Sequence, residues 1–109
     1  METLLGSKHL KRLYLLIIRA AMIKVKIYAE YRDILGTNEI DVPHDTLTFK
    51  EIVDYISQKY NKEFINAAIQ NGKINEYMLV MVGDRMLTSI EDTIKDGEIL
   101  KILATAHGG

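Results

Sequence analysis

The chain has 109 residues, of which 48% are hydrophobic and 27% are charged, and its formal net charge is −1. This length fits one domain with one modest core, the composition excludes wholesale disorder, and the charge gives no general affinity for nucleic acid. The absence of cysteine excludes structural disulfides, thiolate metal sites and a cysteine nucleophile in this chain. Its three histidines lie far apart with no metal-ligand spacing, so we expect no metal site. Nothing requires an oxidising compartment, and we expect a cytoplasmic protein.

Residues 1–21 differ from the rest of the chain in charge. They hold four basic residues and one acidic residue, a balance of +3, whereas the remaining positions hold ten bases and fourteen acids, a balance of −4. The apolar run 13–18 is too short for a secretory signal or a membrane span. Apolar residues at Leu10, Leu13 and Ile17 have the spacing of an amphipathic helix, which could rest on a membrane or a partner. We prefer to interpret 1–21 as an extension upstream of the working domain, because a new pattern begins at Met22.

Two strands are predicted next, over 22–30 and 37–43. In the first, Ile23, Val25 and Ile27 alternate with polar or amphipathic residues, as in a half-buried strand. The stretch 31–36, YRDILG, indicates a helical turn that ends at its glycine, and Pro43 ends the second strand. Strands so close in sequence pair most simply as an antiparallel hairpin.

The main helix is predicted to begin at Thr48 and to end near Asn61. Thr48 and Glu51 have the spacing of a capping box. One apolar stripe with helical spacing follows, formed by Phe49, Ile52, Val53, Ile56 and Tyr60. A weaker helical turn is predicted over 62–73, closed by Asn71-Gly72.

The second half of the chain predicts a hairpin and a last strand. Residues 78–82 indicate a buried strand, Gly83-Asp84 a turn, and Met86 with Leu87 a short return strand. We expect 88–98 to be a loop with one short helical turn, followed by the strand EILKIL. The order strand, strand, helix, strand, short strand, strand predicts an α+β fold of β-grasp type. It has a mixed sheet of four to five strands with one main helix on one face.

These elements resemble the MoaD/ThiS family of ubiquitin-like sulfur carriers, to which the small archaeal modifier proteins are related. The resemblance covers residues 22–109. It is carried, in order, by MIKVKIYAEYRDILG, TFKEIVDYI, MVGDR, DGEILKIL and the terminal GG. It implies that 1–21 are an extension, 22–103 the β-grasp domain and 104–109 a flexible tail.

The resemblance also implies a mechanism. A partner adenylating enzyme of MoeB type, which uses ATP, would activate the carboxylate of Gly109, and a sulfur donor would convert it to a thiocarboxylate. In a MoaD-like protein the tail then enters a MoaE-like large subunit and donates sulfur to a pterin precursor, which forms the dithiolene that holds molybdenum or tungsten. The chain itself would bind no cofactor and carry no free-standing catalysis; it would be the small subunit of a molybdopterin synthase.

The residue types at the terminus suit this role. Glycines have no Cβ, so Gly108 and Gly109 fit a narrow channel and let a partner backbone approach closely. Ala106 and His107 are expected to contact the partner beside Gly108. A second partner surface is expected on the face of the sheet that the helix leaves open, with Met78 and Val80 as its candidates, although both faces of their strand are apolar.

The client of the carrier is left open. MoaD-like tails commonly carry a Pro-Pro-hydrophobic stretch before the glycines, where this chain has Ala104, Thr105, Ala106 and His107. The alternatives are a ThiS-like carrier for thiazole, a carrier for tRNA thiolation, and a protein modifier joined through Gly109 to lysines. A further alternative is a ubiquitin-fold interaction module whose tail does not react.

Overall fold

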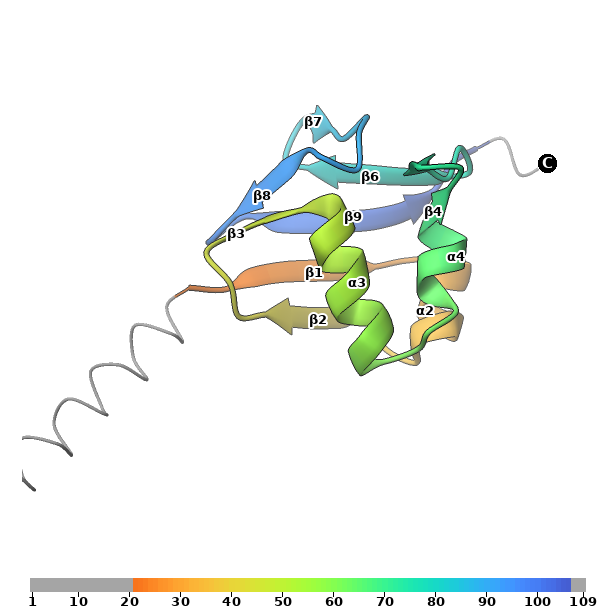
Figure 1. Ribbon diagram of the computed structural model, residues 1–109, viewed down its shortest axis with the longest axis horizontal. Coiled ribbons are helices and arrows are strands. Elements are labelled where there is room, and N and C mark those ends of the chain that lie inside the picture. The colour runs from red at the N-terminus through yellow and green to blue at the C-terminus, as the bar shows by residue number, and fades with distance from the viewer. Residues whose placement is uncertain (1–20, 107–109) are drawn as a thin grey trace, which may run out of the picture.

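A computed structural model describes residues 21–106 of the chain (Figure 1). Its main sheet has five strands in the order β2-β1-β9-β6-β7. Their bounds are β1 Ile23–Ile27, β2 Glu39–Val42, β6 Met78–Val82, β7 Arg85–Met86 and β9 Ile99–Ala104. β1 and β9 are parallel and the other pairs are antiparallel, including the predicted β1–β2 pair. The predicted mixed sheet of an α+β, β-grasp fold is confirmed.

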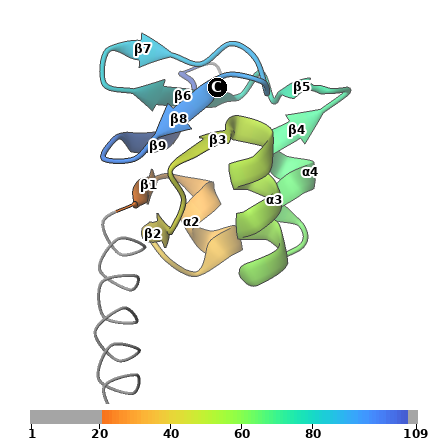
Figure 2. The ribbon, with the colours of Figure 1, turned by 60° about the vertical axis from the view of Figure 1, so that its left-hand side comes forward.

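Three helices lie together on one side of this sheet (Figures 1 and 2). The predicted main helix is α3, Phe49–Lys59, and two shorter helices, α2 Glu30–Leu35 and α4 Phe64–Ala68, contribute to the same core. Side chains from all three helices are buried against the inward residues of the strands, and burial of this apolar area is the main force that holds the layers together.

The start of α3 follows from its sequence. The Thr48 hydroxyl accepts a hydrogen bond from the Glu51 amide at 3.1 Å, and the Glu51 carboxylate accepts one from the Thr48 amide at 2.9 Å. This reciprocal pair is the predicted capping box, and it satisfies amides that the first turn of a helix leaves without partners. The helix ends at Lys59, two residues before the predicted end.

Two turns depend on positive φ angles. Gly36 ends α2 with φ +71° and donates its amide to the Arg32 carbonyl at 2.7 Å. Asn71 and Gly72 have φ +55° and +73° and join two short strands, β4 Ile69–Gln70 and β5 Lys73–Ile74. Both turns were predicted, but the second closes a hairpin rather than the helical turn expected over 62–73, since helix α4 ends at Ala68.

A second strand pair was not predicted either. Residues 88–98 were expected to be a loop with a helical turn, but they contain β8, Thr93–Lys95, which pairs antiparallel with β3, Thr46–Thr48. The pair buries Leu47 and Ile94 against the core. The pair forms because these two side chains pack together although their segments lie far apart in the sequence. A strand of three residues is too short to show a local pattern that would predict it.

The predicted domain boundaries lie close to the ends of the sheet. β1 begins one residue after Met22, whose amide donates to the Asp96 carboxylate at 2.7 Å. β9 includes Ala104, one residue beyond the predicted end of the domain at residue 103. The predicted roles of the extension and of the tail end concern residues outside 21–106, so they stay predictions.

Candidate functional site at the root of the C-terminal tail

The described chain reaches Ala106, so the predicted site residues His107, Gly108 and Gly109 lie outside the described residues. What is described is the tail root, which we define as residues 104–106. Ala104 pairs with Met78 at the end of the β6–β9 ladder. Thr105 then donates its amide to the Tyr77 carbonyl at 2.9 Å, and Ala106 is exposed. The tail therefore leaves the fold beside the first residue of β6 (Figure 1).

Three tyrosines take part in the hydrogen bonds at the end of β9 and at the tail root. β1 runs parallel to β9, and just past its end Tyr28 donates its amide to the Ile102 carbonyl at 2.9 Å. Tyr31, in α2, donates its hydroxyl to the Tyr77 carbonyl at 3.3 Å. The side chain of Tyr31 is buried, with 2% exposed, whereas 38% of Tyr28 and 51% of Tyr77 are exposed. Of these three tyrosines, one is thus buried in the core and two are exposed.

Burial raises the pKa of the Tyr31 hydroxyl. Desolvation, with a smaller contribution from the negative charge of Glu30, raises the pKa of the Tyr31 hydroxyl above its ordinary value of 10.0. A hydroxyl that stays protonated at neutral pH remains available to donate to the Tyr77 carbonyl.

A strained turn separates Tyr28 from Tyr31. Ala29 has φ +57° and ψ −147°, a combination that glycine tolerates and side chains with a Cβ rarely adopt. The turn reverses the chain from β1 into α2 within a few residues. Tyr28, before the turn, continues the β1–β9 pairing to the Ile102 carbonyl, and Tyr31, after the turn, reaches the Tyr77 carbonyl.

The prediction that Met78 and Val80 bind a partner is wrong, because both side chains are buried in the core, with 5% and 1% exposed. Side chains alternate between the two faces of a strand, so Leu79 and Met81 point to the opposite face and are only half-buried. The sequence contained one usable signal. β1 alternates buried aliphatic residues with Lys24 and Lys26, and the lysines identify the outer face.

The strand registers define this outer face, which we call the open face. Lys26 pairs with Lys101, Met81 also pairs with Lys101, and Leu79 pairs with Leu103. Its apolar side chains are exposed or half-buried: Leu79, Met81, Met86, Ile99 and Leu103. The predicted open apolar face therefore exists, but it is formed by the alternate residues of β6 and β9.

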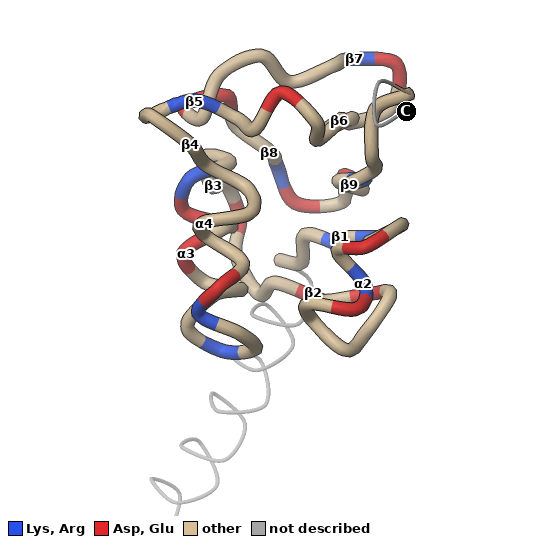
Figure 3. The backbone as a smooth tube through the Cα atoms, turned by 90° about the vertical axis from the view of Figure 1, so that its right-hand side faces the viewer, with Lys and Arg blue, Asp and Glu red and all other residues tan. Residues whose placement is uncertain are grey.

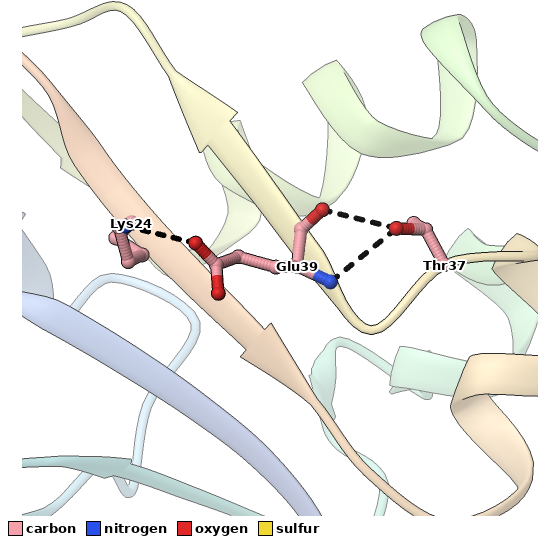
Figure 4. A network of polar contacts seen from close by, with 3 residues as sticks. All are labelled: Lys24, Thr37 and Glu39. Atoms are coloured by element: carbon pink, nitrogen blue, oxygen red, sulfur yellow. Dashed lines mark hydrogen bonds and ion pairs between the residues drawn. The ribbon is translucent and has the colours of Figure 1, made fainter.

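Charged residues of both signs are interspersed along the chain (Figure 3). On the β2 side of the open face, Lys24 and Glu39 form an ion pair at 2.8 Å, and the Thr37 hydroxyl bonds the Glu39 backbone (Figure 4). The hydrogen bond and charge of Lys24 lower the pKa of Glu39, and Glu39 raises that of Lys24. Within residues 21–106, Lys26 and Lys101 have no acidic partner within 4.0 Å.

Between residues 21 and 106, no group of three or more His, Cys, Asp or Glu residues is placed to hold a metal ion. No helix in that part of the chain is long and apolar enough to cross a membrane.

Comparisons with known proteins agree with this geometry. The model of the ThiS family matches residues 25–109. No curated protein sequence gives a significant match. Among solved structures, SAMP1 from Haloferax volcanii has a TM-score of 0.65 and 15% identity, with 81% of this chain and 99% of that chain covered.

Two other solved structures are similar. A chain of the Amycolatopsis orientalis BexX/CysO complex has a TM-score of 0.66 and 23% identity, covering 80% of this chain and 99% of that chain. A putative molybdopterin converting factor, subunit 1, from Pyrococcus furiosus has a TM-score of 0.59 and 19% identity, covering 78% and 98%. These likenesses show the ubiquitin-like β-grasp fold. Because the family match spans most of the sequence, the chain belongs to the ThiS family of ubiquitin-like sulfur carriers.

Proposed function

We propose that this protein is a sulfur carrier that reacts through the Gly109 carboxylate and serves as the small subunit of a molybdopterin synthase. The observation that carries the proposal is the ThiS family match, which extends over Gly108 and Gly109. The fold likeness to the Pyrococcus furiosus putative molybdopterin converting factor, subunit 1, supports molybdopterin as the end product.

The proposed chemistry has two steps. An adenylating enzyme of MoeB type joins the Gly109 carboxylate oxygen to the α-phosphorus of ATP and releases pyrophosphate. Hydrosulfide, supplied by a sulfur donor, then attacks the acyl carbon; the C–O bond to AMP breaks, and a thiocarboxylate, AMP and a proton result. ATP is bound by the partner enzyme, and this chain contributes the acyl group.

The open face is the proposed docking surface for the adenylating enzyme and for a MoaE-like large subunit. It offers Leu79, Met81 and Leu103 next to the tail root, and methionine suits a surface that must fit two partners. Lys26 and Lys101 lie side by side within it, so a matching partner presents an apolar surface with an acidic residue opposite these two ammonium groups.

A second candidate is a protein modifier joined through Gly109 to lysines of other proteins. The likeness in fold to SAMP1, a small archaeal modifier protein, favours it. The acyl-adenylate is common to both candidates; they differ in whether sulfide or a lysine amine attacks it. A thiazole or tRNA-thiolation carrier shares the thiocarboxylate and differs only in the acceptor.

Intact mass spectrometry tests the carrier. After incubation with the adenylating enzyme, ATP and sulfide, we expect the chain to gain the mass difference between sulfur and oxygen. A chain with one alanine added after Gly109 should gain nothing, whereas Tyr60→Ala, at an exposed residue of the α3 end, should react like the wild type. No gain in the wild-type chain, or an equal gain in the extended chain, would show that the terminal carboxylate does not react.

The acceptor is identified in a second experiment. With a MoaE-like subunit and a pterin precursor, the thiocarboxylate should return to the carboxylate mass as the dithiolene forms. A modifier would instead remain on target lysines. Lys101 is the last basic residue before the tail, so trypsin would leave residues 102–109 on such a lysine.

A further inference from the structure

We propose that Tyr31 is a positioning residue for the C-terminal tail, because its buried hydroxyl holds the carbonyl to which the tail root is hydrogen-bonded. The inference rests on the proposed function, in which Gly109 must reach a reacting centre in another protein. It assigns a task to a core side chain that belongs neither to the tail nor to the open face.

The Tyr77 carbonyl is the junction between the tail root and the core. It accepts the Thr105 amide at 2.9 Å and the Tyr31 hydroxyl at 3.3 Å, one donor for each lone pair of the oxygen. The Thr105–Tyr77 bond lies one step beyond Met78–Ala104, the last pair of the β6–β9 ladder. It is therefore the bond at which the ladder would begin to fray.

The side chain of Thr105 is also held against the fold. Its Oγ1 is buried and has no hydrogen-bond partner among the described residues. Burial of an unpaired hydroxyl is unfavourable, so the packing and the backbone bond must together keep Thr105 in place. If the Tyr77 carbonyl were held less firmly, the Thr105 hydroxyl could become hydrated and the tail root could separate from β6.

The path from β1 to α2 fixes Tyr31 in this position. Tyr28, just past the end of β1, is bonded to the Ile102 carbonyl of β9, and after the strained turn at Ala29 the Tyr31 hydroxyl bonds the Tyr77 carbonyl, one residue before β6. The segment 28–31 is therefore bonded both to β9 and to the residue that precedes β6. A strained backbone conformation persists only where the surrounding structure requires it. Here the strain at Ala29 is part of the turn that places Tyr31 at the Tyr77 carbonyl.

Position matters because the tail is short. Gly109 is the fourth residue after Thr105, so its Cα reaches at most about 14 Å from the Thr105 Cα when the tail is extended. If Ala104 and Thr105 separated from the sheet, the mobile part of the tail would be two residues longer and would have no fixed direction. Binding to a partner would then cost more conformational entropy, because these residues would have to be ordered.

The test uses a matched pair of tyrosine variants in the full chain. Tyr31→Phe removes the junction hydroxyl and keeps the ring that fills the core. Tyr55→Phe, in α3, removes a hydroxyl that contacts Lys59. We expect Tyr31→Phe to accelerate hydrogen exchange of the Thr105 amide about three- to tenfold, while Tyr55→Phe leaves it unchanged. Amides of the α3 core should exchange as in the wild type in both variants.

The same variants are compared as substrates of the adenylating enzyme. Tyr31→Phe should raise the KM for the carrier about three- to tenfold with little change in kcat, since the ordering of the tail precedes the chemistry. Thr105→Pro removes the other donor to Tyr77, and the double variant should be no worse than Thr105→Pro alone.

Unchanged Thr105 exchange in Tyr31→Phe, or the same change in Tyr55→Phe, would overturn the positioning role. A fully additive double variant would also overturn it. These outcomes are distinct from failure of the proposed function, which is the absence of any adenylation of the wild-type chain, because the exchange measurement needs no enzyme.

Discussion

Ala29 has the least favourable backbone conformation among the turns at the tail root. Its positive φ brings Cβ close to backbone atoms, a cost that glycine does not have. Ala29→Gly should therefore raise the free energy of unfolding by about 1 kcal/mol, as measured by urea denaturation. Gly36→Ala, which places a Cβ at φ +71°, should have the opposite effect and serves as the matched control. A less stable Ala29→Gly variant would mean that the turn carries no strain.

Sequence and structure diverge most clearly at such single residues. The turns at Gly36 and Asn71-Gly72 were predictable because these residue types favour positive φ. Nothing in an alanine predicts the conformation of Ala29, and nothing in the spacing of Tyr31 predicts that its hydroxyl meets a carbonyl 46 positions away. The tail-root contacts are long-range, so they became visible only in the folded arrangement.

The capping box of α3 makes the stability of this element depend on pH. Hydrogen bonds from the Thr48 backbone and hydroxyl lower the pKa of Glu51 below its ordinary value of 4.5. A carboxyl with a lowered folded-state pKa contributes stability above pH 4.5 that is lost as the pH falls through the folded-state pKa.

Glu51→Gln keeps an oxygen acceptor at this position but removes the titrating group. Its unfolding free energy should fall less steeply than that of the wild type as the pH is lowered below 4.5. Urea denaturation at a series of pH values measures the two slopes. Equal slopes would show that the Glu51 carboxylate does not couple helix capping to protonation.

The two faces of strand β6 have different expected roles, one in the stability of the fold and the other in binding a partner. Val80 is in the core, so Val80→Ala should lower the free energy of unfolding by about 2 kcal/mol. Met81→Ala should cost less stability but weaken binding of the adenylating enzyme about tenfold, because Met81 belongs to the open face. Calorimetric titration and urea denaturation of both variants check this. Stronger loss of binding in a folded Val80→Ala than in Met81→Ala would contradict the assignment of the faces.

The two faces of β6 also mark a limit of prediction at the scale of the element. Its existence and bounds follow from five consecutive apolar residues, but both faces are apolar and periodicity cannot tell which one is buried. The registers of β1 and β6 with β9 resolve the ambiguity, because they place the lysines of β1 on the same side as Leu79 and Met81. The pair β3–β8 was missed for a related reason, as its partners join segments about 47 positions apart.

The order of the main elements along the chain and the fold class were largely predictable, because turns and apolar patterns identify each segment and few arrangements bury them all. The sheet nevertheless has a feature that no single segment reveals. Its central strand, β9, is the last strand in the chain, and it pairs with β1 on one side and β6 on the other.

A last strand at the centre makes completion of the chain a condition for folding. During synthesis β1, β2 and β6 emerge from the ribosome first, but the two halves of the sheet have nothing to join them until residues 99–104 are free. A chain cut short before β9 would expose its apolar strands and fall to proteolysis. A chain therefore completes its sheet only when synthesis has reached the tail root, so under the proposed function the fold and the reactive tail are completed almost together.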